Sequence, residues 1–250
     1  MNDTHPITLV TGANKGIGRE IAGGLAALGH TVVLGSRSAE LGEKAAAELR
    51  ATGADAEALV LDVTDPASVA AAAAGIQARH GRLDTLVNNA GVAVPPGSDL
   101  SSQRPGTVDL AVVRRIFDTN VFGVVTVTDA LLPLLRRSPA PRIVNVSSAA
   151  GSLSLMADQE AWAHEQPPIC VGYIPSKSAL TALTLQYARQ LRPDGILVNA
   201  VCPGFVATDL NGHTGHRTPV QGAAAAVRMA TVPAEGPTGT FSDDQGPVPW

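Results

Sequence analysis

Short apolar runs alternate with longer amphipathic stretches along almost the whole chain. The apolar runs predict seven strands, at 7–11, 31–36, 57–62, 84–88, 142–147, 196–201 and 239–242. Most of them lack the alternation of apolar and polar residues that marks a strand with one face in water, which is typical of parallel strands covered on both faces. Between them, helical spacing of apolar residues predicts helices at 17–29, 38–52, 66–80, 108–136, 172–192 and 219–230.

Strands that alternate with helices predict βαβ units, and therefore a doubly wound α/β fold with one mostly parallel seven-stranded sheet and helices on both faces. The 250 residues contain no internal repeat and no long linker, which favours a single domain, 1–250. Three irregular segments, 92–106, 149–170 and 203–218, each follow a strand. Since ligands bind outside the carboxyl ends of parallel strands, we expect these segments to border one cleft.

Composition narrows the class of protein. A hydrophobic content of 45% supplies a sizeable core, and an aromatic content of 3% means that Ala, Val and Leu must fill it. The net charge of −4, without a basic tract, argues against a nucleic-acid partner. Cys170 and Cys202 indicate no disulfide framework. No stretch suits a membrane span, and the first six residues do not resemble a secretory signal, so we expect a soluble cytoplasmic protein.

The first strand runs into a glycine-rich turn, Thr-Gly-Ala-Asn-Lys-Gly-Ile-Gly at 11–18, and then into a helix. Such a turn presents backbone N–H groups and the positive end of a helix dipole to phosphate, and glycine allows close approach. The spacing is G-x-x-x-G-x-G, not the G-x-G-x-x-G of most dinucleotide folds. The alternative is an ordinary βα turn.

Tyr173 and Lys177 lie four residues apart, which places them on one face of a helix, one turn apart. An ammonium beside a phenol lowers the phenol pKa, so Tyr173 is a candidate proton donor and acceptor. The alternative is that Tyr173 and Lys177 are simply a surface pair, four residues apart, on an exposed helix. Pro175 lies between the two residues and predicts that the helix begins very near Tyr173, because proline is tolerated only in a first turn.

Six motifs in fixed order make the chain similar to the short-chain dehydrogenase/reductase family. They are the glycine loop 11–18, Asn88-Asn89-Ala90-Gly91, Asn120, Ser147-Ser148, Tyr173-x-x-x-Lys177, and Pro203-Gly204 followed by Thr208. The resemblance spans nearly the whole chain. It implies a Rossmann sheet with a cofactor half at about 1–140 and a catalytic and substrate half at about 141–250.

The resemblance also implies roles for four catalytic residues. Tyr173 would exchange a proton with the substrate oxygen while a nicotinamide transfers hydride. Lys177 would bias Tyr173 and bind the nicotinamide ribose, and Ser148, rather than Ser147, would hold the substrate oxygen. Asn120 would distort its helix locally and hold a water in a proton relay. For Ser148 the alternative is a loop cap, and for Asn120 a buried polar residue with backbone partners.

The second strand leads into Ser36-Arg37-Ser38, with no acid to bind ribose hydroxyls as NAD-binding proteins usually have. Arg37 and Lys15 are cations suited to a 2′-phosphate, so we expect NADP(H), although Arg37 alone is also typical of a solvated helix start. The cofactor-binding residues that the resemblance implies are Gly12, Asn14, Lys15, Gly16, Ile17, Gly18, Arg37, Asp62, Val63, Asn89, Ala90, Gly91, Tyr173, Lys177, Pro203, Gly204, Val206 and Thr208.

Tyr173 follows Ser148 by 25 residues, roughly twice the separation in many family members, so 149–170 holds an insertion. Carbonyl reductases of the family carry an insertion at this place, and the chain resembles that branch. We expect the insertion to contain a short helix at 157–165, to shape the substrate pocket and to favour a monomer, although a homo-oligomer stays open. Segment 203–218 is expected to form part of a substrate lid.

The leading hypothesis is therefore an NADPH-dependent carbonyl reductase or alcohol dehydrogenase that acts on a small-molecule carbonyl or alcohol. The alternative is an NADP(H)-binding regulatory protein with little or no turnover, and a third reading is epimerase or dehydratase chemistry. No metal is expected, because His213, His216 and Asp209 have no convincing further ligands.

Overall fold

The structure is a computed structural model that describes residues 5–158 and 167–250. Its seven strands form one sheet in the order β3-β2-β1-β4-β5-β6-β7, and every neighbouring pair is parallel. The strands are β1 Ile7–Thr11, β2 Thr31–Ser36, β3 Ala56–Val60, β4 Thr85–Asn88, β5 Arg142–Val146, β6 Leu197–Val201 and β7 Phe241–Ser242. The predicted doubly wound α/β fold is thus confirmed, with a sheet that is wholly parallel.

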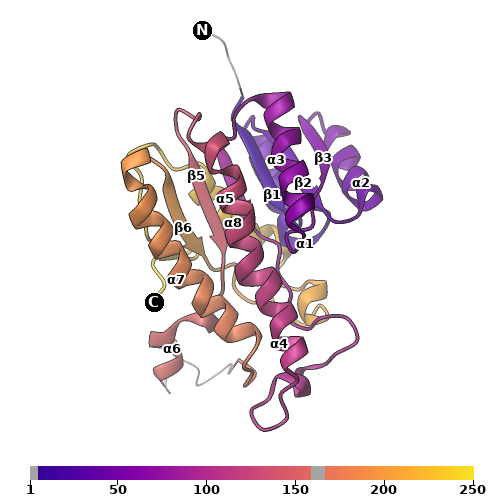
Figure 1. Ribbon diagram of the computed structural model, residues 1–250, viewed down its shortest axis with the longest axis vertical. Helices are drawn as coiled ribbons and strands as arrows, with labels where there is room; N and C mark the ends of the chain where they lie inside the picture. The colour runs from indigo at the N-terminus through magenta and orange to yellow at the C-terminus, as the bar shows by residue number, and fades with distance from the viewer. Residues whose placement is uncertain (1–4, 159–166) are drawn as a thin grey trace.

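Helices cover both faces of this sheet, as Figure 1 shows. On one face lie α1 (Gly16–Ala27), α2 (Ala39–Arg50) and α8 (Pro219–Ala230), and on the other lie α3 (Pro66–His80), α5 (Gly123–Leu135) and α7 (Tyr173–Leu191). Two shorter helices, α4 (Leu110–Phe117) and α6 (Leu153–Ala157), extend beyond one end of the sheet. The alternation of strand and helix that the sequence predicts holds throughout the described chain.

Successive strand residues feed two separate cores, one on each face of the sheet. Val10, Val32 and Leu34 face α1, α2 and α8, whereas Leu9 and Val33 face α3, α5 and α7. Because both faces are buried, the strands need apolar residues at nearly every position. The largest fully buried side chains are all leucine or isoleucine, as the scarcity of aromatic residues requires.

The long helix predicted at 108–136 is interrupted. Its helical pattern is continuous, but α4 ends at Phe117 and a π-helical turn, Asp118–Phe122, separates it from α5. The turn buries Asn120, whose side chain bonds to neighbouring segments instead of facing outward. A single-turn π-bulge inserted in a helix is frequently associated with a functional site. The local distortion expected at Asn120 is therefore present.

The insertion after β5 contains a short helix that ends where the predicted one begins. Helix α6 ends at Ala157, where the predicted helix 157–165 begins. Residues 159–166 lie outside the described part of the chain, so that prediction stays untested there.

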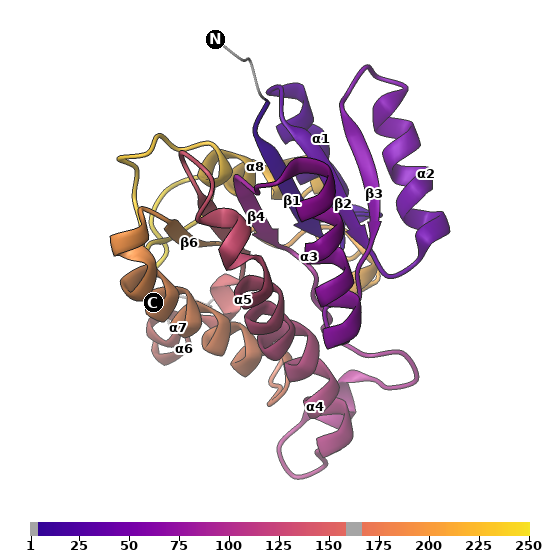
Figure 2. The same cartoon turned by 45° about the horizontal axis from the view of Figure 1, so that its top comes forward.

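Because all strands are parallel, their carboxyl ends lie along one edge of the sheet. The order reverses between β1 and β4, which have their crossover connections on opposite sides, and this is where doubly wound folds bind ligands. In the rotated view of Figure 2, α4 and α6 lie beyond the end of the sheet at which the strands have their carboxyl ends. The fold thus brings the loops after β1, β4, β5 and β6 to one side of the molecule.

Candidate active site

The glycine loop after β1 packs directly against the turn after β4. The Asn89 side chain donates hydrogen bonds to the Thr11 carbonyl at 2.9 Å and to the Gly12 carbonyl at 3.3 Å. Thr11 Oγ1 accepts from the backbone N–H groups of Asn89 and Ala90, each at 3.0 Å. A Cβ on Gly18 would lie 2.4 Å from Asn89 Nδ2, so the contact requires glycine there. Two predicted motifs, 77 residues apart, therefore form one rigid junction.

Helix α1 begins at this junction with its N-terminus uncapped. Its N-cap residue, Lys15, makes no side-chain capping bond, and its first turn has no acid. By contrast, Ser38, Asp65 and Asp109 cap α2, α3 and α4 with their side chains. The open N–H groups and the helix dipole suit a phosphate. The loop therefore fits the diphosphate of a dinucleotide. Its backbone N–H groups are available as donors, and Gly12 and Gly16 adopt the positive φ values of +64° and +57° that favour glycine.

Helix α7 begins at Tyr173, as Pro175 predicts. The backbone N–H of Tyr173 is bound by a distant side chain, because Gln103 Oε1 accepts its hydrogen bond at 3.0 Å. The other end of the same amide donates to the Ala93 carbonyl at 2.8 Å. Gln103 is fully buried. Segment 92–106 thus holds the start of the helix that carries Tyr173.

Lys177 lies one turn further along α7 and is 5% exposed. Its Nζ donates to the Val146 carbonyl at 2.9 Å and lies 5.7 Å from the centre of the Tyr173 ring. Burial lowers the pKa of Lys177 from 10.5 to about 8. A Cβ on Gly91 would come within 3.5 Å of Nζ, so the turn after β4 also borders this ammonium.

The pKa of Tyr173 runs opposite to the sequence-based expectation. Desolvation by the surrounding protein raises it above the usual value of 10, and this outweighs a lowering hydrogen bond to Ser148. The buried thiols of Cys202 and Cys170 add to the rise. The sequence showed the neighbouring cation, but the desolvation depends on how the segments pack. The phenol is therefore protonated at neutral pH in this structure.

Ser148 and Tyr173 meet although the insertion separates them. The Ser148 hydroxyl bonds to the Tyr173 side chain and accepts from the Ala150 N–H at 3.3 Å. Ser147 is buried and donates to the Lys177 carbonyl at 3.3 Å. The arrangement favours Ser148 over Ser147 as the serine that reaches a substrate. Ser148 is also the N-cap of a short helical turn. The alternative role as a loop cap is therefore compatible with the expected catalytic role.

Asn120 joins three segments at the site. Its amide bonds to the N–H and carbonyl of Val92, at 2.8 and 2.9 Å, and donates to Ser176 Oγ at 3.0 Å. Both amide hydrogens are thus used within the protein. The contacts favour the alternative of a buried polar residue that positions its neighbours, and the relay role of Asn120 stays a prediction.

Residues expected at the adenosine end of the cofactor lie apart from this cluster. Arg37, after β2, is exposed and has no ion-pair partner among the described residues. Asp62, after β3, accepts bonds from the N–H and hydroxyl of Thr64, and Val63 is buried in the core beside α5. They share the carboxyl edge of the sheet with the glycine loop, but within the described part of the chain no hydrogen bond or ion pair joins them to it.

The segment after β6 is anchored at its base and reaches the glycine loop. Val206 is buried and forms a parallel bridge with Arg217, and Arg217 pairs with Asp244 at 2.6 Å. Further along, Lys15 forms an ion pair with Asp209, which also accepts from His213 at 2.7 Å. A Cβ on Gly16 would lie 3.6 Å from the Thr208 methyl group. Pro203 and Gly204 lead out of the strand into this segment.

Sequence reasoning missed Gln103 and Asp209. Gln103 lies in a loop without periodicity, and its partner Tyr173 is 70 residues away. The sequence places Asp209 near His213 and His216, whereas its cationic partner, Lys15, is 194 residues away. No local signal marks either pairing. In the described ranges 5–158 and 167–250, no group of three or more His, Cys, Asp or Glu side chains suits a metal. Cys170 and Cys202 are both free and buried.

No helix in the described ranges is long and apolar enough to cross a membrane. The short chain dehydrogenase family model matches residues 6–218.

Named relatives match almost from end to end. "Short-chain dehydrogenase/reductase 1" of Saponaria officinalis is 38% identical over 93% of this chain and 92% of its own length. "Carbonyl reductase [NADPH] 1" of Mus musculus is 34% identical over the full length of both chains. Among solved structures, the Pseudomonas aeruginosa RhlG/NADP active-site complex superposes with a TM-score of 0.81 at 28% identity, covering 96% of this chain and 94% of that one.

Proposed function

This chain belongs to the short-chain dehydrogenase/reductase family, and we propose that it transfers hydride between NADP(H) and a small carbonyl or alcohol substrate, with Tyr173 as the general acid and base. The observation that carries the proposal is the convergence of Tyr173, Ser148 and Lys177. They come from two segments separated by the insertion, yet a side-chain hydrogen bond joins Tyr173 to Ser148, and Lys177 lies beside the Tyr173 ring.

The cofactor would bind across the carboxyl edge of β1 and β4. The uncapped start of α1 would take the diphosphate, and Lys15 and Arg37 would take the 2′-phosphate, because both cations follow neighbouring strands. Relatives with NADPH or NADP in their names support this choice. When bound, the nicotinamide supplies or accepts the hydride.

The protein's own residues handle the proton and the substrate oxygen. Since the raised pKa keeps the Tyr173 phenol protonated at neutral pH, the hydroxyl is ready to protonate a carbonyl oxygen. Ser148 would donate a second hydrogen bond to that oxygen. Lys177, with a pKa of about 8, is largely charged at neutral pH and would stabilise the phenolate that remains.

The described walls around these residues favour an uncharged substrate. Segment 149–157 follows Ser148, 167–172 precedes Tyr173, and 203–208 follows β6, and none of these three stretches contains a charged side chain, whereas segment 92–106 carries Asp99 and the exposed Arg104. The three stretches expose apolar side chains instead, including Leu153, Ile169 and Phe205. A carboxylated or phosphorylated substrate would find no cationic partner on them, because burying an unpaired charge is costly.

The test is the loss of NADPH absorbance with a panel of neutral aldehydes, quinones and cyclic ketones. We expect turnover with at least one member and a fall of about 10²–10⁴-fold in kcat for Tyr173→Phe, with NADPH affinity retained. Unchanged turnover in Tyr173→Phe would remove the proton role from this residue. NADPH binding without turnover on the whole panel would instead favour a regulatory protein of the same fold.

A further inference from the structure

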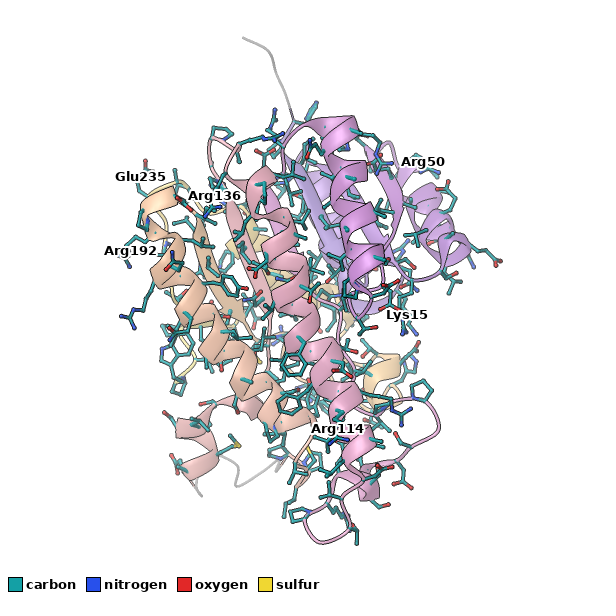
Figure 3. The ribbon with its side chains drawn as sticks, viewed as in Figure 1. Lys15, Arg50, Arg114, Arg136, Arg192 and Glu235 are labelled. Carbon is teal, nitrogen blue, oxygen red and sulfur yellow. The ribbon has the colours of Figure 1, made fainter. Side chains whose placement is uncertain are left out.

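Lys15, in the glycine loop, already forms an ion pair within the protein. Its ammonium contacts the Asp209 carboxylate, although both side chains are more than half exposed, at 64% and 54%. Figure 3 shows Lys15 at the edge of the N-terminal half, facing the segment drawn in yellow-orange. The Lys15 ammonium and the His213 ring hold the pKa of Asp209 below its usual range, so Asp209 is charged at neutral pH. The pair thus joins the glycine loop to the segment after β6.

The proposed cofactor needs the same ammonium. The Ala13 N–H donates to the Gly35 carbonyl at 3.0 Å, which holds the glycine loop against the end of β2, two residues before Arg37. Lys15 and Arg37 each follow this contact by two residues, so a 2′-phosphate bound by both would lie at this corner of the sheet. A carboxylate bound to Lys15 would repel a phosphate dianion at that position.

The loop that carries Asp209 has a fixed base, and its tip is held by hydrogen bonds within the loop and by the exposed ion pair to the glycine loop. Its base is secured by the Val206–Arg217 bridge and by the Arg217–Asp244 pair. A Cβ on Gly215 would lie 2.3 Å from the Val206 carbonyl carbon, so the two arms of the loop pack in direct contact. Asp209 lies in the arm beyond this base and pairs with Lys15 across exposed surface. Exposed ion pairs of this kind are weak enough to exchange partners.

We propose, resting on the function proposed above, that Asp209 is a specificity-determining residue that competes with the 2′-phosphate of NADP(H) for Lys15. Binding of the phosphorylated cofactor exchanges the Lys15–Asp209 pair for a Lys15–phosphate pair and releases the tip of the loop. NAD(H) has no such phosphate and leaves the pair intact. The contact therefore reduces the preference for NADP(H) below what Lys15 and Arg37 would otherwise produce, and it couples cofactor type to loop mobility.

The experiment measures NADPH and NADH dissociation constants by fluorescence titration of the full chain. Asp209→Asn removes the competing charge, and we expect it to tighten NADPH about two- to fivefold, the range of a surface ion pair, and to leave NADH unchanged. The matched control is Asp194→Asn, which changes the net charge equally and breaks an exposed pair with Arg136 at 2.8 Å, at the opposite edge of the sheet. We expect it to change neither constant.

The same substitution in a Lys15→Gln protein distinguishes competition for Lys15 from a general effect of removing one negative charge. In Lys15→Gln, adding Asp209→Asn should no longer tighten NADPH, because the contested cation is gone. Tightening that persists there, equal tightening of both cofactors, or unchanged or weakened NADPH in Asp209→Asn would overturn the proposal. Weakening of both cofactors would mean that the pair clamps the loop closed. Wild-type protein that binds neither dinucleotide would overturn the proposed function as well.

Hydrogen exchange supplies an independent readout on the loop. The His213 N–H donates to the Thr208 carbonyl at 2.9 Å, and the Asn211 N–H to the same oxygen at 3.2 Å. We expect saturating NADPH, but not saturating NADH, to speed exchange of these two amides. Slower exchange with NADPH would contradict the release of the tip.

Discussion

The Gln103 side chain caps the helix that begins at Tyr173, with Oε1 accepting from the Tyr173 N–H at 3.0 Å. A Cβ on Gly172 would lie 2.5 Å from that oxygen, so the residue before Tyr173 leaves the space for the bond. The Gln103 carbonyl also accepts from the Val171 N–H at 2.9 Å. Gln103 therefore fastens the loop after β4 to the start of α7 through two hydrogen bonds.

Replacement of Gln103 by Met, which keeps the size and removes both amide bonds, should destabilise the protein by about 1–3 kcal/mol, because a part-buried N–H and a part-buried carbonyl lose their partners. As a positioning residue for Tyr173, it should also lower kcat more than it raises KM. Urea unfolding and steady-state kinetics measure the two effects. A stability loss with unchanged kcat would mean that Gln103 is structural alone.

Arg37 should account for much of the preference for the phosphorylated cofactor. Since it is exposed and unpaired in the described structure, Arg37→Ala should leave folding unchanged. The substitution should weaken NADPH binding by about 10–100-fold, the range of a charge-assisted hydrogen bond, and change the affinity for NADH little. Titration of both cofactors checks this expectation. Similar losses for NADPH and NADH would place Arg37 away from the 2′-phosphate.

The lowered pKa of Lys177 makes a signed prediction for stability against pH. Between about pH 8 and 10.5, the unfolded chain holds the Lys177 proton and the folded protein releases it, so this group makes stability rise with pH. The full effect is about 3 kcal/mol at 1.36 kcal/mol per pKa unit. Below pH 8 both states are protonated and the slope vanishes.

Other buried groups oppose this rise, because the raised pKa values of Cys202, Tyr173 and Tyr187 remove stability at high pH. The measurement is therefore a comparison of wild type with Lys177→Met in urea at pH 7 to 10. The wild type should gain stability relative to the variant as pH rises above 8. Parallel pH profiles for the two proteins would contradict the lowered pKa.

Gly151 sets how closely the loop after Ser148 approaches α7. A Cβ there would lie 2.8 Å from the Lys177 backbone carbon and from Lys177 Cβ, so Gly151→Ala should cost about 1–3 kcal/mol through overpacking. It should also impair catalysis by displacing Ser148 from Tyr173. Thermal unfolding and kcat/KM measure both effects.

The matched control for that substitution is Gly75→Ala in α3. Its Cβ would meet Leu59 at an ordinary 3.6 Å, and alanine in a helix interior is favoured over glycine by about 0.5–1 kcal/mol. Gly75→Ala should therefore stabilise the protein slightly. Equal destabilisation by the two substitutions would show that close packing at Gly151 is not the cause.

Local pattern was sufficient for most of the fold. The start of α7 at Tyr173 followed from Pro175, and α3 has the predicted bounds, Pro66–His80, because Asp65, Pro66 and Gly81 mark its ends within a few residues. The helical repeat at 108–136 does not show the π-helical turn at Asp118–Phe122, which is stabilised by contacts of Asn120 with other segments; only the family resemblance implied a distortion there. A helical repeat contains no record of those contacts.

The sequence by itself determined the strand and helix order, the glycine loop and the six ordered motifs, because each is encoded in residues that are close along the chain. Only the tertiary structure decided that Gln103 caps Tyr173, that Lys15 pairs with Asp209, and that the phenol pKa rises instead of falling. Pairing across 70 or 194 residues and desolvation both depend on which groups meet in space and how much water they exclude. Both the long-range pairing and the desolvation arise only when the chain packs into its tertiary structure.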